Sequence, residues 1–341
     1  MGGHLIPVVL ATICCLVPGV LHAGDYDFPG YAEMRERLGE LYQNGEYAKA
    51  AELMEWSVGE YPDHLMANSY NLALMYCRLE RVDDAIDVLL AALDHEVWFH
   101  GHAFANEAWE PVTRHERFAE IEAVNDELRQ KAQEQAELEV TVVTPESYDP
   151  ERTYPLFIAL HGGNGNKTEF KNIWTSERMS GEFIVAYAQS SQVESMTGFG
   201  WTDSPETARR DITQAYRDLV AEYPVDEDEV IVGGFSSGGV ASLDVALSGT
   251  IQVVGFVALC PGRPESFSDQ ALAEAATRGL RGSVLTTEMD PRLPEQREMV
   301  EAMEKAGLRH RFVITPDVGH WIPDDLGAQL DSSIDFILST D

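Results

Sequence analysis

A serine with a glycine on either side lies between a strand-like segment and a helix-like segment. Residues 230–240 read VIVGGFSSGGV, and Gly234 and Gly238 lie two residues before and two residues after Ser236. A serine on a sharp turn between strand and helix projects its hydroxyl outward, and small residues at these two places let the strand and the helix approach closely. Ser237 lacks this setting because a phenylalanine lies two residues before it. The pattern predicts Ser236 as a nucleophile; the alternative is a glycine-rich turn without a chemical role.

A serine hydroxyl becomes a nucleophile when a histidine accepts its proton and a carboxylate orients that histidine. On a parallel sheet these partners follow later strands, in the chain order serine, acid, histidine. Asp290 follows the strand-like residues 283–287, and His320 follows the strand-like residues 311–315. We therefore predict Asp290 as the orienting acid and His320 as the base. Glu288 is the rival acid, because it lies directly at the end of the same predicted strand.

The attack of a serine on a carbonyl creates a negative oxygen, which backbone N–H groups can stabilise. The N–H of Ser237, the residue after the nucleophile, is the first predicted donor. The loop HGGNGN at residues 161–166 follows a long apolar segment, and its glycines let the backbone approach a substrate closely. We predict the N–H of Gly163 as the second donor, with Gly162 as the neighbouring alternative. The loop could also hold a phosphate, but the chain has neither of the usual phosphate-binding glycine patterns.

Apolar segments of strand length alternate with helical segments in the second part of the chain. Strands that are apolar throughout and alternate with helices form a mostly parallel sheet with helices on both faces. The chemistry of such sheets gathers at the carboxyl ends of the strands. A solvent-exposed turn is predicted at residues 226–229. The loop at residues 198–202 carries Trp201, which either lines a substrate pocket or packs on the sheet edge. The predicted strands are residues 138–143, 154–160, 183–188, 230–233, 253–259, 283–287 and 311–315, and the clearest helices are residues 211–223 and 294–306.

The first part of the chain, from residue 31 to about residue 128, has a helical pattern without strand-like segments. Ala50 and Ala85 lie 35 residues apart, and tyrosine and leucine recur at matching places before them. This near-repeat resembles tetratricopeptide repeats over about residues 31–95. Two repeats bury too little surface to stand alone, so residues 96–128 are expected to cover their open end. Two interpretations of the repeats stay open: a module that binds a protein partner or guides a substrate, or a structural cap on the catalytic domain.

Four signals occur in one order along the chain: HGG at residues 161–163, GFSSGG at 234–239, the Asp290 loop, and Gly319 before His320. In this order they resemble the α/β-hydrolase superfamily over about residues 138–341. Trp201 and the segments DI at 211–212 and YPVD at 223–226 are similar to its esterase and polyester-depolymerase-like branch. The resemblance implies Ser236 as nucleophile, His320 as base and then acid, and Asp290 as the carboxylate that orients it. The preceding helical repeats are not typical of those esterases.

These observations together predict an α/β fold with an N-terminal all-α, tetratricopeptide-like domain. The expected activity is that of a serine hydrolase that cleaves carboxylic esters through an acyl-enzyme, on a small-molecule or peptide substrate, without metal or cofactor. A serine peptidase or amidase of the same fold and a non-catalytic, repeat-based scaffold remain as alternatives. The expected divisions are a signal peptide at residues 1–23, a helical domain at 24–130, a linker at 131–137 and a catalytic domain at 138–341.

The chain is strongly acidic: it has 24 Lys and Arg against 58 Asp and Glu, which gives a net charge of −34. Such a surface repels nucleic acid and anionic lipid, so neither is an expected partner. Lysine occurs only 5 times among the 341 residues. Acidic, lysine-poor surfaces suit proteins that function in concentrated salt, because the salt screens the repulsion between like charges on the surface. We therefore expect activity to persist as the salt concentration is raised.

Residues 5–23 form an apolar run that ends in Ala23 before Gly24. This run resembles a secretory signal and favours a periplasmic or secreted protein; an uncleaved membrane anchor is the alternative. Two cysteines lie in this run, and the other two, Cys77 and Cys260, are expected to be free buried thiols. The three histidines at positions 95, 100 and 102 miss the spacing of a zinc-binding helix, so no metal site is predicted there.

Overall fold

The computed structural model describes residues 26–339 of the chain. The predicted signal peptide therefore lies outside the described residues. The chain divides into two compact units, with the division between Lys131 and Ala132. Within the described residues, none of the helices combines the length and the apolar character that crossing a membrane requires.

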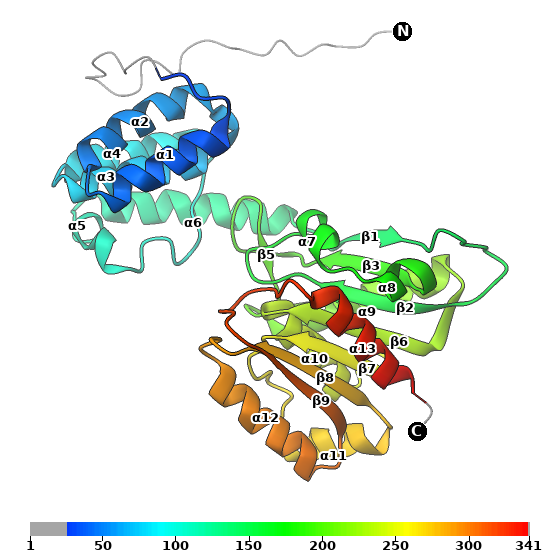
Figure 1. The fold of residues 1–341 in the computed structure, drawn as a ribbon. Helices are drawn as coiled ribbons and strands as arrows, with labels where there is room; N and C mark the ends of the chain where they lie inside the picture. The colour runs from blue at the N-terminus through cyan, green and yellow to red at the C-terminus, as the bar shows by residue number, and fades with distance from the viewer. Residues whose placement is uncertain (1–25, 340–341) are drawn as a thin grey trace, which may run out of the picture. The chain divides into compact units, whose positions relative to one another are not determined.

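The first unit is built from helices, as the sequence predicts (Figure 1). Its first four α-helices come in two pairs, and each pair is joined by a turn of three residues. A long helix, α6, ends the unit and continues into the segment predicted as a linker. The helices are α1 (Tyr31–Gln43), α2 (Tyr47–Glu60), η1 (Pro62–His64), α3 (Leu65–Arg78), α4 (Val82–Asp94), η2 (Glu107–Trp109), α5 (Glu110–Thr113) and α6 (Phe118–Gln135).

The two helix pairs share one turn geometry at the 35-residue spacing seen in the sequence. Gly45, after α1, has φ +71°, and Glu80, after α3, has φ +59°. A residue in this left-handed region is a common way to end a helix, because it lets the next N–H groups bond to the last helical carbonyls. Ala50 and Ala85 are both fully buried. The equivalent turns and buried alanines give the two pairs the same local structure.

Residues 96–128 pack against the helix pairs, as expected for a segment that covers their end. Trp109 is fully buried, and its indole Nε1–H donates to the hydroxyl of Tyr70 on α3 at 2.8 Å. That hydroxyl donates in turn to the carbonyl of Ala103 at 2.6 Å. Buried aromatic side chains with satisfied polar atoms hold such a segment firmly in place.

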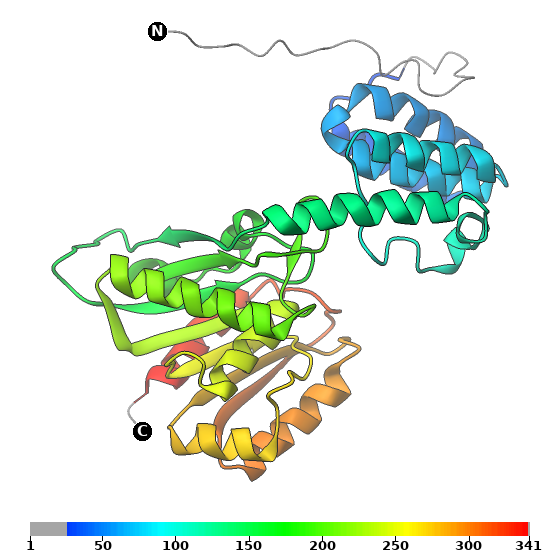
Figure 2. The ribbon, with the colours of Figure 1, turned by 180° about the vertical axis from the view of Figure 1, so that it is seen from behind.

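The second unit is a seven-stranded sheet with helices on both faces (Figures 1 and 2). The strand order is β1-β3-β2-β6-β7-β8-β9; only β1 runs antiparallel to its neighbour, and the other pairings are parallel. This arrangement confirms the predicted mostly parallel sheet. The strands are β1 (Glu139–Val143), β2 (Tyr154–Leu160), β3 (Ile184–Gln189), β6 (Val225–Phe235), β7 (Gly255–Leu259), β8 (Arg281–Thr287) and β9 (Arg309–Thr315).

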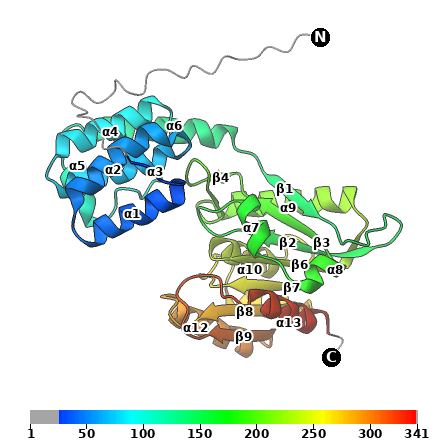
Figure 3. The ribbon, with the colours of Figure 1, turned by 45° about the horizontal axis from the view of Figure 1, so that its top comes forward.

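Two hydrophobic cores lie on the two faces of this sheet, because successive side chains of a strand point to opposite faces. Along β2, Leu156 and Ile158 face one core while Phe157 and Ala159 face the other. The first core is covered by α9 (Pro205–Glu222), α10 (Ser237–Ser248), α11 (Asp269–Thr277) and α12 (Leu293–Lys305). The second core is covered by α7 (Lys167–Ile173), α8 (Glu177–Glu182) and α13 (Leu326–Leu338), which share one face in Figure 3.

Two details of the predicted secondary structure are wrong. Residues 226–229 are not a turn between elements but part of β6, which begins at Val225. They form a bulge, because the pairing with β2 jumps from Val225 opposite Tyr154 to Val230 opposite Leu156. The acidic residues of the bulge are therefore left out of the pairing with β2. The loop at residues 198–202 also contains a strand, β5 (Phe199–Gly200), which pairs with β4 (Gln192–Val193).

Candidate active site

Ser236 lies on a sharp turn between the end of β6 and the start of α10. Its backbone angles are φ +52° and ψ −112°, a conformation that residues other than glycine rarely adopt and that costs energy. A Cβ on Gly234 would lie 2.4 Å from the carbonyl oxygen of Leu160, and one on Gly238 would lie 2.1 Å from the same oxygen. Both contacts are with backbone atoms, so only glycine fits at these positions. The local fold thus holds the Ser236 hydroxyl outward on a rigid turn.

His320 connects the Ser236 hydroxyl to the Asp290 carboxylate. His320 Nε2 lies 2.9 Å from Ser236 Oγ, and His320 Nδ1 lies 2.9 Å from Asp290 Oδ2. The structure therefore brings together the three side chains that the sequence places far apart. The loops after β8 and β9 are tied to each other: the Thr287 hydroxyl and the Met289 N–H donate to the carbonyls of Gly319 and Val318.

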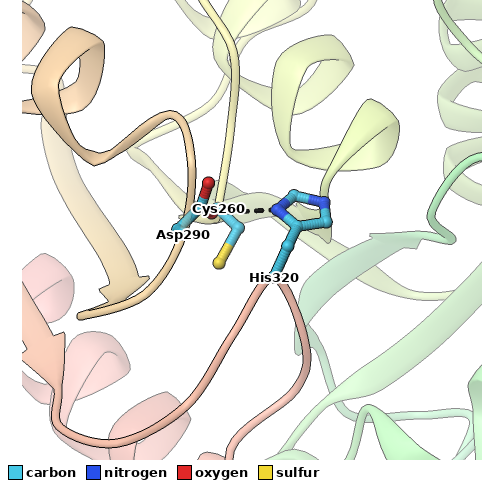
Figure 4. Close-up of side chains that lie close together, drawn as sticks. All are labelled: Cys260, Asp290 and His320. Atoms are coloured by element: carbon cyan, nitrogen blue, oxygen red, sulfur yellow. Dashed lines mark hydrogen bonds and ion pairs between the residues drawn. The ribbon is translucent and has the colours of Figure 1, made fainter.

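Asp290 is held by donors from several directions and is almost fully buried. The N–H of Arg292 donates to Oδ1 at 2.7 Å, and Gln296 Nε2 lies 3.4 Å from Oδ2. The Cys260 thiol lies within 4.8 Å of this carboxylate, and its Sγ is 3.7 Å from Thr287 Oγ1. Figure 4 shows Cys260, Asp290 and His320 clustered, each on the loop after a different strand. Consecutive strands β6, β7, β8 and β9 thus each contribute one residue to the site.

Electrostatics keeps Asp290 ionised and Cys260 neutral. Burial alone raises the pKa of Asp290, but the neighbouring Arg292 N–H, Cys260 thiol and His320 ring outweigh it and lower the pKa below its usual value. Burial first, and then the neighbouring Asp290 carboxylate, raise the pKa of the Cys260 thiol to about 12. A histidine that faces an ionised carboxylate keeps its proton on Nδ1, which leaves Nε2 free to accept one.

The cluster also has the donor types of a metal site. Cys260, Asp290 and His320 each place one possible metal-ligand atom within 4.8 Å of the others. They form the only group of three such residues among residues 26–339. Two of these donors, His320 Nδ1 and Asp290 Oδ2, already bond to each other. A chain of hydrogen bonds from acid to histidine to serine accounts for this geometry without an ion.

The glycine loop after β2 presents its backbone to the same end of the sheet. His161 Nδ1 and the Gly165 N–H both lie within hydrogen-bonding distance of the Gly162 carbonyl oxygen, at 2.7 and 3.1 Å. Because a trans peptide is planar, the Gly163 N–H points away from that oxygen. Burial lowers the pKa of His161 to about 4, so its ring is neutral at pH 7 and donates from Nδ1. Gly163 also lies next to Ser237, whose Oγ would be 3.7 Å from a Cβ on this glycine.

The Ser237 N–H is the first of α10, and the first N–H groups of a helix have no partner within it. The N-terminal end of a helix also carries a partial positive charge, which suits a developing negative oxygen. The two N–H groups predicted for the oxyanion therefore lie on adjacent segments beside Ser236.

A largely apolar cavity of about 320 Å³ opens beside the glycine loop. Phe235 and Trp321, the neighbours in sequence of Ser236 and His320, form part of its wall. Two of the lining side chains, Ile173 and Trp321, are 48% and 67% exposed, which is unusual for large apolar residues. The lining consists of residues 161–166 with Glu169, Phe170, Ile173, Phe235, Trp321 and Ile322.

Trp201 does not line this cavity. It is 1% exposed, belongs to one of the two sheet cores and lies beside the ring of His161, with a centroid distance of 5.3 Å. It borders a separate cavity of about 270 Å³ with Val240 and Arg263. The packing interpretation of Trp201 therefore agrees better with its position than the pocket interpretation does.

Comparisons with known proteins agree with this architecture. Residues 156–283 match the model of the alpha/beta hydrolase family. The second unit has the α/β-hydrolase fold. No protein among those with curated descriptions matches the chain.

Several solved structures match the chain at low sequence identity. An uncharacterised protein from Bacillus cereus ATCC 10987 is 19% identical, with a TM-score of 0.50, and the alignment covers 91% of this chain and 99% of that one. The Bacillus cereus carboxylesterase is 14% identical over 62% of this chain and 99% of its own, with a TM-score of 0.47. The esterase PE8 is 16% identical over 59% of this chain and 100% of its own, with a TM-score of 0.48.

The second unit contains site residues that were not predicted from the sequence. Cys260 follows directly after β7, so the rule that chemistry gathers at strand ends could have found it. Gln296 and the cavity residue Ile173 lie on helices and follow no such rule. Glu194 lies in the hairpin of β4 and β5, and no sequence pattern marks it. Its carboxylate accepts a hydrogen bond from the N–H of Asn164 in the glycine loop.

Proposed function

We propose that this hydrolase domain cleaves carboxylic esters through an acyl-enzyme on Ser236. The observation that carries the proposal is the position of His320, 2.9 Å from Ser236 Oγ on one ring nitrogen and 2.9 Å from Asp290 on the other. A base within this distance can take the serine proton as the oxygen attacks. The hydroxyl, imidazole and carboxylate form the arrangement that activates serine nucleophiles on unrelated folds.

The first half of the reaction forms the acyl-enzyme. Ser236 Oγ attacks the ester carbonyl carbon, and its proton passes to His320 Nε2. The carbonyl oxygen becomes negative and accepts hydrogen bonds from the N–H groups of Gly163 and Ser237. Asp290 holds the protonated ring through Nδ1–H. The tetrahedral centre then collapses, the alcohol leaves with the proton from His320, and the acyl group remains on Ser236.

The second half releases the acid by the same groups. Water loses a proton to His320 Nε2 and attacks the acyl carbonyl, and the second tetrahedral centre forms with its oxygen at the same two N–H groups. Collapse of this centre returns the proton to Ser236 and frees the carboxylic acid. The apolar lining of the cavity beside the glycine loop favours an apolar acyl group as the bound half of the ester.

Turnover of p-nitrophenyl esters by the wild-type protein and by Ser236→Ala tests the proposal. We expect the variant to lose nearly all activity, while Ser248→Ala, which changes an exposed serine on the same helix, keeps it. Equal turnover by Ser236→Ala and the wild type would contradict the proposal. Aminoacyl amides in the same panel separate an esterase from a peptidase. Binding of a protein by the helical unit and export to the periplasm or outside stay predictions.

A further inference from the structure

The side chain of Glu194 reaches the glycine loop from the hairpin of β4 and β5. Its carboxylate oxygen Oε2 accepts a hydrogen bond from the N–H of Asn164, the residue after the predicted oxyanion donor Gly163. The same oxygen would lie 3.3 Å from a Cβ on Gly163. Ser237 Oγ would lie 3.7 Å from that point, so the carboxylate, the loop and the start of α10 meet in one small region.

Two glycines make room for this side chain. A Cβ on Gly200 would lie 1.7 Å from Glu194 Oε1 and 2.4 Å from its Cδ. A Cβ on Gly163 would also press on the carboxylate. The side chain of Glu194 thus fills a slot that exists because Gly200 has no side chain and that a side chain on Gly163 would narrow. Neither glycine has a positive φ, so backbone conformation does not explain their presence.

The hydrogen bond from Asn164 fixes a part of the loop that needs support. Asn164 has φ +56°, which is uncommon for a residue with a side chain. Its N–H belongs to the peptide that joins it to Gly163. The carbonyl of Gly162 fixes the preceding peptide through His161 and Gly165. Both peptides that flank the α-carbon of Gly163 are therefore held, one by His161 and Gly165 and the other by Glu194.

We propose that Glu194 is a positioning residue for the oxyanion site, because its carboxylate holds the Gly163–Asn164 peptide and so helps to fix the α-carbon of Gly163, whose own N–H belongs to the preceding peptide. This inference rests on the function proposed above. Glu194 acts through its ability to accept a hydrogen bond and not through its charge. A negative charge beside a developing oxyanion opposes catalysis, so the neutral glutamine should serve at least as well.

Three substitutions test the role of Glu194. Removing one donor from an oxyanion site lowers kcat by about 10²- to 10³-fold, and we expect misplacing one in Glu194→Ala to lower kcat by at least about tenfold. KM should change little, because the ground state depends less on this donor. Glu194→Gln keeps a hydrogen-bond acceptor, so its kcat should stay within about threefold of the wild-type kcat or exceed it. Glu304→Ala, on the exposed side of α12, is the matched control and should have no effect.

Gly200→Ala provides an independent test from the other side of the slot. Its new methyl group would push the Glu194 carboxylate away from Asn164, so Gly200→Ala should lower kcat as Glu194→Ala does. In the Glu194→Ala background the slot is empty, and Gly200→Ala should have little further effect. Additive losses in the double variant would overturn the proposal, because they would mean that the two positions act separately.

Binding of a trifluoromethyl ketone separates a positioning role from a structural one. The ketone forms a tetrahedral adduct with Ser236 whose oxygen occupies the oxyanion site. Its affinity should fall in Glu194→Ala by about the same factor as kcat/KM, since both report stabilisation of the tetrahedral state. An unchanged affinity together with a lowered melting temperature would show a purely structural role and would overturn the proposal.

Hydrogen exchange needs no turnover and keeps this inference distinct from the proposed function. The Asn164 amide should exchange faster in Glu194→Ala and Gly200→Ala than in the wild type, Glu194→Gln or Glu304→Ala. Unchanged exchange would overturn the anchoring role whatever the activity. Faster exchange with unchanged kcat would overturn its role in catalysis. A wild-type protein that turns over no ester and forms no ketone adduct would instead contradict the proposed function.

Discussion

Asp290 and His320 are hydrogen-bonded through Oδ2 and Nδ1 at 2.9 Å, although the Glu288 carboxylate leaves the same strand end two residues earlier. Glu288 instead accepts a hydrogen bond from the N–H of Asp317 at 3.2 Å. The two residues differ in backbone position. The N–H of Glu288 donates to the Thr315 carbonyl and so continues the β8–β9 pairing, whereas Asp290 lies on the turn that follows. The sequence alone only favours Asp290 over Glu288 as the acid, whereas in the structure only Asp290 is hydrogen-bonded to His320.

The first prediction follows from this separation. Asp290→Asn should lower kcat by roughly 10⁴-fold, because an amide at this place favours the histidine tautomer that cannot accept the serine proton. Glu288→Gln should leave kcat nearly unchanged, since its partner is a backbone N–H of a loop. Steady-state turnover of a short acyl ester by the two variants measures both effects. A larger loss in Glu288→Gln than in Asp290→Asn would show that the acid has been assigned to the wrong residue.

The second prediction concerns the thiol of Cys260, which lies beside the Asp290 carboxylate and helps to lower its pKa. Cys260→Ala removes this polar neighbour of the acid, and we expect kcat to fall by about three- to tenfold, as for the loss of one ordinary hydrogen bond of about 1 kcal/mol. Cys260→Ser retains a donor and should remain close to the wild type. Cys260 is fully buried and its pKa is raised to about 12, so iodoacetamide should not modify the folded protein there. Rapid alkylation at Cys260 under native conditions would contradict the described environment.

The third prediction is a dependence of stability on pH through His161. Its pKa of about 4 in the folded protein is below the value near 6.5 of an unfolded chain, so the unfolded state binds more protons between these values. The stabilisation is therefore fully present above pH 6.5 and is lost as the pH falls toward 4. His161→Asn keeps a donor for the Gly162 carbonyl but does not titrate. Between pH 7 and pH 4 the wild type should lose up to roughly 3 kcal/mol more unfolding free energy than the variant.

Urea unfolding at several pH values measures this difference directly. The comparison with His161→Asn is needed because the many carboxylates of an acidic protein also titrate in the lower part of this range. A difference between wild type and variant that stays constant from pH 7 to pH 4 would show that His161 is not a buried neutral histidine in the folded protein.

The fourth prediction concerns the cavity beside the glycine loop. Ile173→Asp and Trp321→Ala should lower kcat/KM for octanoyl esters much more than for acetyl esters, because each buried methylene contributes about 0.8 kcal/mol. We expect the octanoyl-to-acetyl ratio of kcat/KM to fall by about tenfold. Val143→Ala, an exposed apolar residue on β1 outside the cavity, is the control. An unchanged ratio in both cavity variants would mean that the acyl chain binds elsewhere.

The arrangement of the sheet and of the serine, acid and histidine could be predicted because both follow from local rules. Apolar runs of strand length that alternate with helices specify a parallel sheet. Once the strands are placed in the sequence, the loops at their carboxyl ends, where the chemistry gathers, are placed as well. Ser236, Asp290 and His320 all lie within five residues of such an end. The turn at Ser236 is specified by two flanking glycines, because a side chain at either position would clash with the backbone of β2.

Other features depend on contacts that the sequence does not reveal. The bulge at residues 226–229 arises because β6 is longer than its partner β2, and a single strand cannot show how its neighbour pairs. Glu194 reaches the glycine loop only through the β4–β5 hairpin, which is too short to leave an apolar pattern. Trp201 fits either a pocket or a core by type, and only its burial separates these interpretations.

The most direct test of the account is covalent labelling with a fluorophosphonate, which reacts with serines that a neighbouring base activates. We predict one adduct per chain, mapped by mass spectrometry to Ser236, and no adduct in Ser236→Ala. His320→Ala should label far more slowly, because the hydroxyl then keeps its proton. Wild-type protein that remains unlabelled, or that carries the adduct on another residue, would contradict the central claim that His320 and Asp290 make Ser236 a nucleophile.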